Sequence, residues 1–170
     1  MRLNNIALVA ALVFGITSCS EAQQKASKPN PYYTHKGSSK MNLPDSEWKK
    51  VLPENTYNIL RNKQTEAPGT GQYLHNDAAG TYYCAACGNP LFKSDGKFES
   101  GCGWPSFYQP FNDSSIITSV DKSHGMVRTE IMCGRCHGHI GHVFDDGPAP
   151  TGQRYCTNGG ALHFEGAVKK

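Results

Sequence analysis

The stretch from Cys133 to Asn158 gathers the side chains that are best suited to chemistry. It begins with a Cys-x-x-Cys pair, carries three histidines and two aspartates, and ends with Cys156 close to Arg154. A packed helix would not tolerate the glycines and prolines that recur along it, namely Gly134, Gly138, Gly141, Gly147, Pro148, Pro150 and Gly152. The stretch is therefore predicted to form loops and short strands, with one end binding a metal and the other presenting a reactive thiol.

Two Cys-x-x-Cys pairs account for four of the seven cysteines. They are Cys84 with Cys87 and Cys133 with Cys136. Each pair can present two thiolates from one tight turn, which Gly88 and Gly134 would permit, and four thiolates complete the tetrahedral coordination of zinc. Because no ligand position stays open, the predicted zinc is structural. It would cross-link distant parts of one domain.

Three other interpretations of these four cysteines stay open. They could form two disulfides, as in many exported proteins, or each pair could close on itself as a redox motif. The run from Cys133 to His137 also matches Cys-x-x-Cys-His, the attachment sequence of a c-type haem. Against haem, the first cysteine pair would then lack a purpose, and the surrounding sequence is Gly-rich and strand-like rather than helical.

Cys102 and Cys156 form a second candidate site. The positive charge of Arg154 favours the thiolate form of Cys156, and His139 and His142 could return toward it across the Gly/Pro turn. Glycines on both sides of Cys102 make its loop mobile enough to approach another thiol. A static disulfide between these two cysteines is an equally open interpretation.

Short helices are predicted at the start of the domain. Asp45 or Ser46 is suited to cap a helix that contains Trp48. Pro53 suits the first turn of a second helix, in which Tyr57 and Leu60 fall on one stripe; Val51 and Leu52 complete the apolar side of the first helix.

Short strands are predicted after a turn at residues 66–71. One strand leads into Cys84, and two hairpins are expected, one around residues 94–96 and one around Gly125. In the second hairpin, alternation places Val127, Thr129 and Ile131 on one face, and Arg128, Glu130 and Met132 on the other. Residues 161–164 are predicted to form a closing strand.

The N-terminal part of the chain has the pattern of an exported protein. Residues 1–18 are predicted to be a signal peptide, because their apolar run is shorter than the roughly 20 residues that span a membrane. Ile16 to Cys19 resembles a bacterial lipoprotein box, so Cys19 is a candidate lipid anchor. Residues 19–44 are polar and predicted to be a flexible tether to a single domain at 45–168.

Composition narrows the classes of partner. The formal net charge is only +3, and no block of Lys and Arg occurs in the chain, so nucleic acid is not an expected partner. Eighteen glycines and ten prolines favour turns and strands over a bundle of helices.

Three motifs resemble the B-type methionine-R-sulfoxide reductases. They are SGCGWPSF around Cys102, GHVFDDGP at residues 141–148 and RYCTN at residues 154–158, and the resemblance spans roughly residues 46–164 with both Cys-x-x-Cys pairs in order. It implies a mainly β fold, with two antiparallel sheets in a barrel-like core, short N-terminal helices outside it, and a structural zinc at the four cysteines. His137 departs from the pattern expected after the second pair.

The resemblance also implies a role for each site residue. Cys156 would attack the sulfoxide sulfur and become a sulfenic acid, and Cys102 would resolve it as a disulfide. A thioredoxin-like dithiol would then reduce the enzyme. His139 and His142 would surround the sulfoxide and Trp104 would face its methyl group, while Asn158, Asp146 and Arg154 would order the site.

Two other functions remain as alternatives. A zinc-ribbon binding module would need only the Cys-x-x-Cys pairs, and a membrane-tethered thiol-disulfide oxidoreductase would use Cys102 and Cys156 on protein disulfides. The expected substrates are oxidised proteins or peptides that bear methionine-R-sulfoxide. The expected location is the bacterial cell envelope, as a periplasm-facing lipoprotein or an exported soluble protein.

Overall fold

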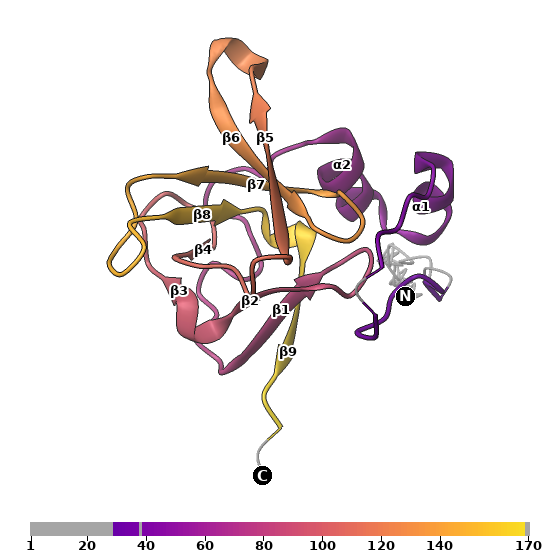
Figure 1. The fold of residues 1–170 in the computed structure, drawn as a ribbon, viewed down its shortest axis with the longest axis horizontal. Helices are drawn as coiled ribbons and strands as arrows, with labels where there is room; N and C mark the ends of the chain where they lie inside the picture. The colour runs from indigo at the N-terminus through magenta and orange to yellow at the C-terminus, as the bar shows by residue number, and fades with distance from the viewer. Residues whose placement is uncertain (1–28, 38, 169–170) are drawn as a thin grey trace, which may run out of the picture.

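The computed structural model describes residues 29–37 and 39–168 of the chain, which fold into two antiparallel β-sheets with two short helices at one end (Figure 1). The smaller sheet has the strand order β2-β1-β9 and the larger has β3-β4-β8-β7-β6-β5. The strands are β1 (Gly80–Cys84), β2 (Pro90–Lys93), β3 (Lys97–Phe98), β4 (Ser106–Phe107), β5 (Ile116–Asp121), β6 (Arg128–Cys133), β7 (His139–Phe144), β8 (Arg154–Thr157) and β9 (Leu162–Gly166). The predicted mainly β fold is confirmed. The larger sheet is open, because its described end strands β3 and β5 do not pair with each other.

The core lies between the two sheets and is built largely from aromatic rings. Phe92 of β2 stacks on Phe107 of β4 with ring centroids 4.3 Å apart, and the ring of Tyr82 meets that of Phe107 edge-on at 5.0 Å. All three side chains are fully buried. Such aromatic contacts join the small sheet to the large one and hold the strands that carry the cysteines.

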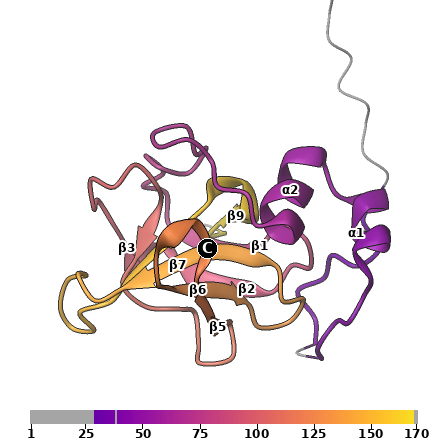
Figure 2. The same cartoon turned by 90° about the horizontal axis from the view of Figure 1, so that it is seen from above.

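The two helices cover one end of the sheets, as Figure 2 shows. They are α1 (Asp45–Val51) and α2 (Glu54–Asn62). Each follows a proline at its N-cap position, Pro44 and Pro53, and neither has a side-chain cap. Asp45 is therefore the first helical residue rather than the predicted cap.

One predicted hairpin is correct and the other is wrong. Strands β5 and β6 pair in register from Ile116 opposite Cys133 to Asp121 opposite Arg128. By contrast, β2 pairs with β1, and β3 pairs with β4 in the other sheet. Residues 94–96 wind into a 3-10 turn that carries the chain between the sheets instead of reversing it. A turn-like composition predicted the bend but not the partner of each strand.

The described part of the predicted tether lies against the domain. We call residues 29–37 and 39–44 the N-terminal strap. The backbone N–H of Thr34 donates to the carbonyl of Cys87 (3.1 Å), and that of Met41 donates to the carbonyl of Arg135 (2.8 Å). The predicted signal peptide and Cys19 lie outside the described residues. In the described part of the chain, each helix falls short of the length and apolar character needed to cross a membrane.

Candidate active site and metal site

The two Cys-x-x-Cys pairs meet in one buried cluster. The Sγ atoms of Cys84 and Cys136 lie 3.6 Å apart, as do those of Cys87 and Cys133, and all four lie within 4.8 Å of one another. Thiolates bound 2.3 Å from a tetrahedral zinc lie about 3.8 Å apart, whereas disulfide sulfurs lie about 2.05 Å apart. The geometry therefore fits one metal ion rather than two disulfides. It also places Cys133 and Cys136 in a four-thiol cluster rather than at a haem attachment site.

The two turns that carry these cysteines have the same construction. In each, the residue after the second cysteine has a left-handed backbone, Gly88 with φ 73° and His137 with φ 59°. The N–H of each donates to the carbonyl of the first cysteine at 2.9 Å. His137 thus adopts the same left-handed conformation, and makes the same backbone hydrogen bond, as Gly88. Gly134 is needed for another reason, because a Cβ there would overlap the carbonyl oxygen of Ser114.

Arg135 ties the strap to this cluster. Its side chain is buried, and Nη1 donates to the carbonyls of Thr34 (2.6 Å) and Cys87 (2.9 Å), while Nη2 donates to that of Gly37. One guanidinium therefore satisfies three backbone carbonyls, two of them from the strap. The strap and both cysteine turns form one hydrogen-bonded unit.

Cys102, in the loop between β3 and β4, lies beside Cys156 on strand β8 of the large sheet. Their Sγ atoms are 3.6 Å apart and both are free thiols. Cys156 is on β8 opposite Ser106 of β4, whose hydroxyl also contacts the sulfur of Cys102 at 3.5 Å. The hydroxyl of Ser100 donates to the sulfur of Cys102 at 3.0 Å. The pair has the spacing of reduced thiols that need only a small movement to form a disulfide.

The two thiols differ in pKa. Burial raises the pKa of Cys156 to about 12, and the negative charge of Cys102 adds to this effect, while Arg154 acts against both. For Cys102, burial is outweighed by hydrogen bonds from Ser100 and Ser106, which lower the pKa to about 7. The predicted effect of Arg154 on Cys156 has the expected sign, but burial is larger. The first proton is therefore lost from Cys102.

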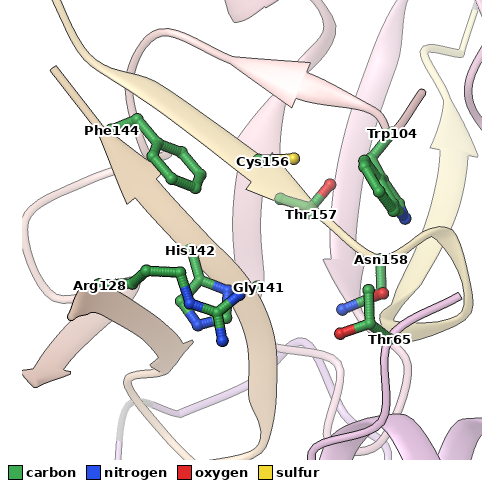
Figure 3. Close-up of a pocket in the computed structure, with 9 residues that line it drawn as sticks. All are labelled: Thr65, Trp104, Arg128, Gly141, His142, Phe144, Cys156, Thr157 and Asn158. Carbon is green, nitrogen blue, oxygen red and sulfur yellow. The ribbon is translucent and has the colours of Figure 1, made fainter. Parts of the chain in front are cut away.

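A small cavity of about 110 Å³ opens beside Cys156. Figure 3 shows the Cys156 sulfur between the rings of Phe144 and Trp104, with His142, Arg128 and Asn158 around the same space. The remaining lining residues are Thr65, Gly141 and Thr157. The cavity is smaller than the roughly 300–1,000 Å³ of sites that enclose a drug-sized ligand. It is suited to a single side chain with an apolar end.

Strand register builds this site. His142 on β7 lies opposite Cys156 on β8 and opposite Glu130 on β6, so these three side chains share one face of the sheet. Two residues along, Phe144 lies opposite Arg154, whose guanidinium stacks over its ring at 4.4 Å. The sheet thus brings together residues that are distant in the sequence.

Each histidine has its own carboxylate partner. Nε2 of His142 lies 2.8 Å from Oδ2 of Asp121, and Nδ1 of His139 lies 2.8 Å from Oε1 of Glu130. Burial lowers the pKa of His139, although Glu130 acts in the opposite direction. His142 lines the cavity; His139 packs behind it, with ring centroids 5.5 Å apart. The two predicted histidines therefore have different positions relative to a bound ligand.

The remaining predicted residues hold the walls of the cavity. The indole N–H of Trp104 donates to the carbonyl of Glu66 (3.0 Å), and the amide of Asn158 donates to the carbonyl of Ile140 (3.0 Å) and accepts from the backbone of Glu66 (3.0 Å). Arg154 forms a bidentate ion pair with Asp146 at 2.8 and 2.9 Å. The sequence analysis did not identify several neighbours of the site, namely Thr65, Glu66, Ser100, Ser106, Asp121, Arg128, Glu130 and Phe144. Alternation in β6 was the only signal that grouped Arg128 with Glu130.

A partly exposed pair of thiols beside an apolar cavity, together with a separate four-cysteine cluster that could hold a metal ion, is typical of a thiol-based oxidoreductase. Residues 52–166 match the SelR domain family. Three curated relatives are each named "Peptide methionine sulfoxide reductase MsrB". The protein of Hahella chejuensis is 52% identical over 128 residues, which cover 75% of this chain and 92% of the relative. That of Bradyrhizobium diazoefficiens is 55% identical over 121 residues, covering 71% and 87%.

The third relative, from Leptospira interrogans, is 56% identical over 125 residues, covering 74% of this chain and 95% of its own length. The chain belongs to the methionine-R-sulfoxide reductase B family, and its activity is the reduction of peptide methionine sulfoxide. The resemblance found in the sequence is confirmed.

Proposed function

We propose that the protein reduces methionine-R-sulfoxide in oxidised proteins by attack of Cys156, followed by a disulfide with Cys102. The observation that carries this proposal is the position of Cys156. Its thiol lines the apolar cavity and lies 3.6 Å from the thiol of Cys102, which does not line the cavity. Only Cys156 is therefore placed to meet a bound sulfoxide.

In the first step, the sulfur of Cys156 bonds to the sulfoxide sulfur and then takes its oxygen. Methionine leaves, and Cys156 becomes a sulfenic acid, so that the thiol is oxidised by two electrons and the sulfoxide is reduced by two. The sulfoxide methyl group fits between Trp104 and Phe144, since a sulfur-bound methyl group packs well against aromatic rings.

Proton movements follow from the pKa values of the two thiols. Hydrogen bonds favour the thiolate of Cys102, whereas burial disfavours the thiolate of Cys156. The Cys102 thiolate is thus the nearest base for the proton of Cys156 as attack begins. His142 donates its Nε2–H to the carboxylate of Asp121, and when the ring also carries a proton on Nδ1, that proton can pass to the sulfoxide oxygen.

In the second step, the sulfur of Cys102 attacks the sulfenic sulfur of Cys156. A disulfide forms and the oxygen leaves as water. A thioredoxin-like dithiol then reduces this disulfide by exchange and becomes a disulfide itself. The zinc ion that fits the four buried cysteines would hold Cys84, Cys87, Cys133 and Cys136 as a closed set of thiolates. Its contribution is to the stability of the fold.

The test uses the two separate epimers of a methionine sulfoxide derivative, with dithiothreitol as reductant. Turnover of the R epimer alone is expected. When the methyl group is bound in the cavity, only the R epimer directs its sulfoxide oxygen toward the proton donor. Turnover of the S epimer, or of neither, would overturn the proposal. A parallel assay on a protein disulfide separates it from a general thiol-disulfide oxidoreductase.

We further propose that the protein acts in the cell envelope, held by a lipid on Cys19. Support comes from the apolar run at residues 6–16 and the lipoprotein-like box that ends at Cys19. Several acyl chains would hold the domain at the membrane, since one chain binds only marginally. Labelling with a radioactive fatty acid should mark the protein, and Cys19→Ala should remove the label. A soluble mature protein that begins beyond Cys19 would refute the anchor but not the activity.

A further inference from the structure

Arg128 brings a permanent positive charge to the cavity beside Cys156. It is the first residue of strand β6, lines the cavity, and belongs to the hairpin of β5 and β6 that projects from the domain in Figure 1. Its partner across the hairpin is Asp121, the last residue of β5. The pairing of the two strands therefore places an arginine and an aspartate side by side at the site.

One oxygen atom of Asp121 connects Arg128 to His142. Oδ2 of Asp121 accepts a hydrogen bond from Nη2 of Arg128 at 2.7 Å and lies 2.8 Å from Nε2 of His142. The other oxygen, Oδ1, accepts a hydrogen bond from the backbone N–H of Ser123 at 2.8 Å. The hairpin itself thus holds both oxygens, and the guanidinium of Arg128 lies next to the imidazole of His142 in Figure 3.

The three connected side chains are shielded from water. Those of Arg128, Asp121 and His142 are 22%, 17% and 11% exposed, so their charges are screened less than charges on an open surface. Hydrogen bonds from Ser123 and His142, together with the charge of Arg128, hold the pKa of the Asp121 carboxyl well below its usual range. Asp121 is therefore a carboxylate at neutral pH, fixed in place to accept the Nε2–H of His142.

Asp121 and Arg128 act in opposite directions on a second proton of the His142 ring. The carboxylate stabilises the doubly protonated ring, whereas the guanidinium, bound to the same oxygen, destabilises it. A general acid needs a fixed orientation and a proton that leaves readily. We infer that Arg128 is a positioning residue, which acts through Asp121 to orient His142 and to promote release of its Nδ1 proton to the sulfoxide oxygen. This inference rests on the proposed function at Cys156.

The experiment follows one turnover of the R epimer without reductant, as a function of pH, so that recycling of the thiols does not limit the rate. Arg128→Met should slow methionine formation about tenfold, a part of the roughly 10²–10⁴-fold that a positioned acid contributes. The loss of rate at alkaline pH should begin roughly half a pH unit higher, the scale of one charge a few ångströms away in water. Asp121→Asn should move this loss to lower pH.

Two further variants separate charge from structure. Arg128→Lys keeps the charge and should keep the pH dependence of the wild type, with an intermediate rate. Lys122→Met is the matched control, since it removes a positive charge from an exposed side chain of the same hairpin, and it should behave as the wild type. The other titratable groups facing His142 are unchanged in all four variants, namely Glu130 on β6, His139 on β7 and Cys156 on β8.

Nuclear magnetic resonance of the ring nitrogens gives a readout that does not depend on activity. The neutral ring of His142 should carry its proton on Nε2 in the wild type and be distributed between both nitrogens in Arg128→Met. An unchanged ring and pH dependence in Arg128→Met, or a shift in the same direction as in Asp121→Asn, would overturn the inference. A wild-type protein without activity on the R epimer would instead overturn the proposed function.

Discussion

The molecule holds two groups of thiols with the same spacing and opposite surroundings. In the four-cysteine cluster and in the Cys102–Cys156 pair alike, neighbouring sulfurs lie 3.6 Å apart. The cluster is buried between two rigid turns and joins four thiols, whereas Cys102 and Cys156 are partly exposed, and Cys156 opens onto a cavity. Distance between sulfurs therefore does not decide their chemistry.

What separates the two groups is access and hydrogen bonding. The four cluster thiols are all buried and can complete the coordination of an ion. The sulfur of Cys102 instead accepts a hydrogen bond from the hydroxyl of Ser100, which helps to lower its pKa to about 7. The four-cysteine cluster is suited to hold an ion away from solvent, whereas the Cys102–Cys156 pair is suited to react with a bound molecule.

The largest expected effect comes from breaking the cluster. Cys133→Ser should lose the bound metal and unfold the domain, because the binding energy of a structural site is also folding energy. Metal analysis and circular dichroism would show both losses. Cys102→Ser is the control and should keep its metal. A folded Cys133→Ser protein with a normal melting temperature would contradict the role given to the cluster.

Cys156→Ser should abolish activity while leaving the metal and the fold intact. We expect kcat/KM for the R epimer to fall by roughly 10³-fold or more, the scale of losing a nucleophile, because a hydroxyl does not replace the thiol at neutral pH. Metal content and melting temperature should match the wild type. Appreciable turnover in this variant would remove Cys156 as the nucleophile.

Cys102→Ser should leave a single turnover intact. The variant should accumulate a sulfenic acid on Cys156, visible by a trapping reagent and mass spectrometry, and lose cycling with thioredoxin. Normal cycling would show that another group resolves the sulfenic acid. Dithiothreitol is the matched reductant, since it can reduce the sulfenic acid directly.

The same variant tests the charge coupling between the two thiols. The negative charge of Cys102 raises the pKa of Cys156, so its removal should lower that pKa from about 12. Alkylation of Cys156 by iodoacetamide, followed against pH, should therefore begin at lower pH in Cys102→Ser. In the wild type, Cys102 should alkylate with a midpoint near its pKa of about 7. An unchanged Cys156 profile would mean that the charge of Cys102 does not influence the pKa of Cys156.

The smallest effect concerns the strap. Arg135→Met should release metal to a chelator several-fold faster and lower the melting temperature by about 5 °C, because the carbonyls of Thr34, Gly37 and Cys87 each lose a hydrogen bond from the guanidinium. Lys36→Met, which removes an exposed strap charge, should behave as the wild type. Equal release rates in the two variants would show that the strap does not protect the cluster.

Local patterns in the sequence predicted much of this arrangement. Cysteine spacing indicated one metal site, and alternation predicted the β5–β6 hairpin and its two faces. The carboxylate partners Asp121 and Glu130 were missed, because they reach His142 and His139 only through the register of neighbouring strands. No local pattern specifies which strands become neighbours, and the error over residues 94–96 has the same cause.

The sequence also did not predict which of the two thiols has the lower pKa. Arg154 next to Cys156 suggested a thiolate there, but the bidentate pair with Asp146 and the burial of Cys156 limit its effect. Ser100 and Ser106 reach Cys102 through the fold of one short loop. Burial and hydrogen bonding are properties of the folded site.

Docking of the N-terminal strap also limits how far the domain can lie from Cys19. With the strap bound from Pro29 onward, the chain back to Cys19 spans at most about 36 Å, whatever its conformation. With the strap released as far as Asp45, the same chain would span up to about 90 Å. If Cys19 carries the proposed lipid, the hydrogen bonds of Arg135 keep the catalytic domain within a few tens of ångströms of the membrane surface. Detachment of the strap would more than double the radius within which it finds damaged proteins.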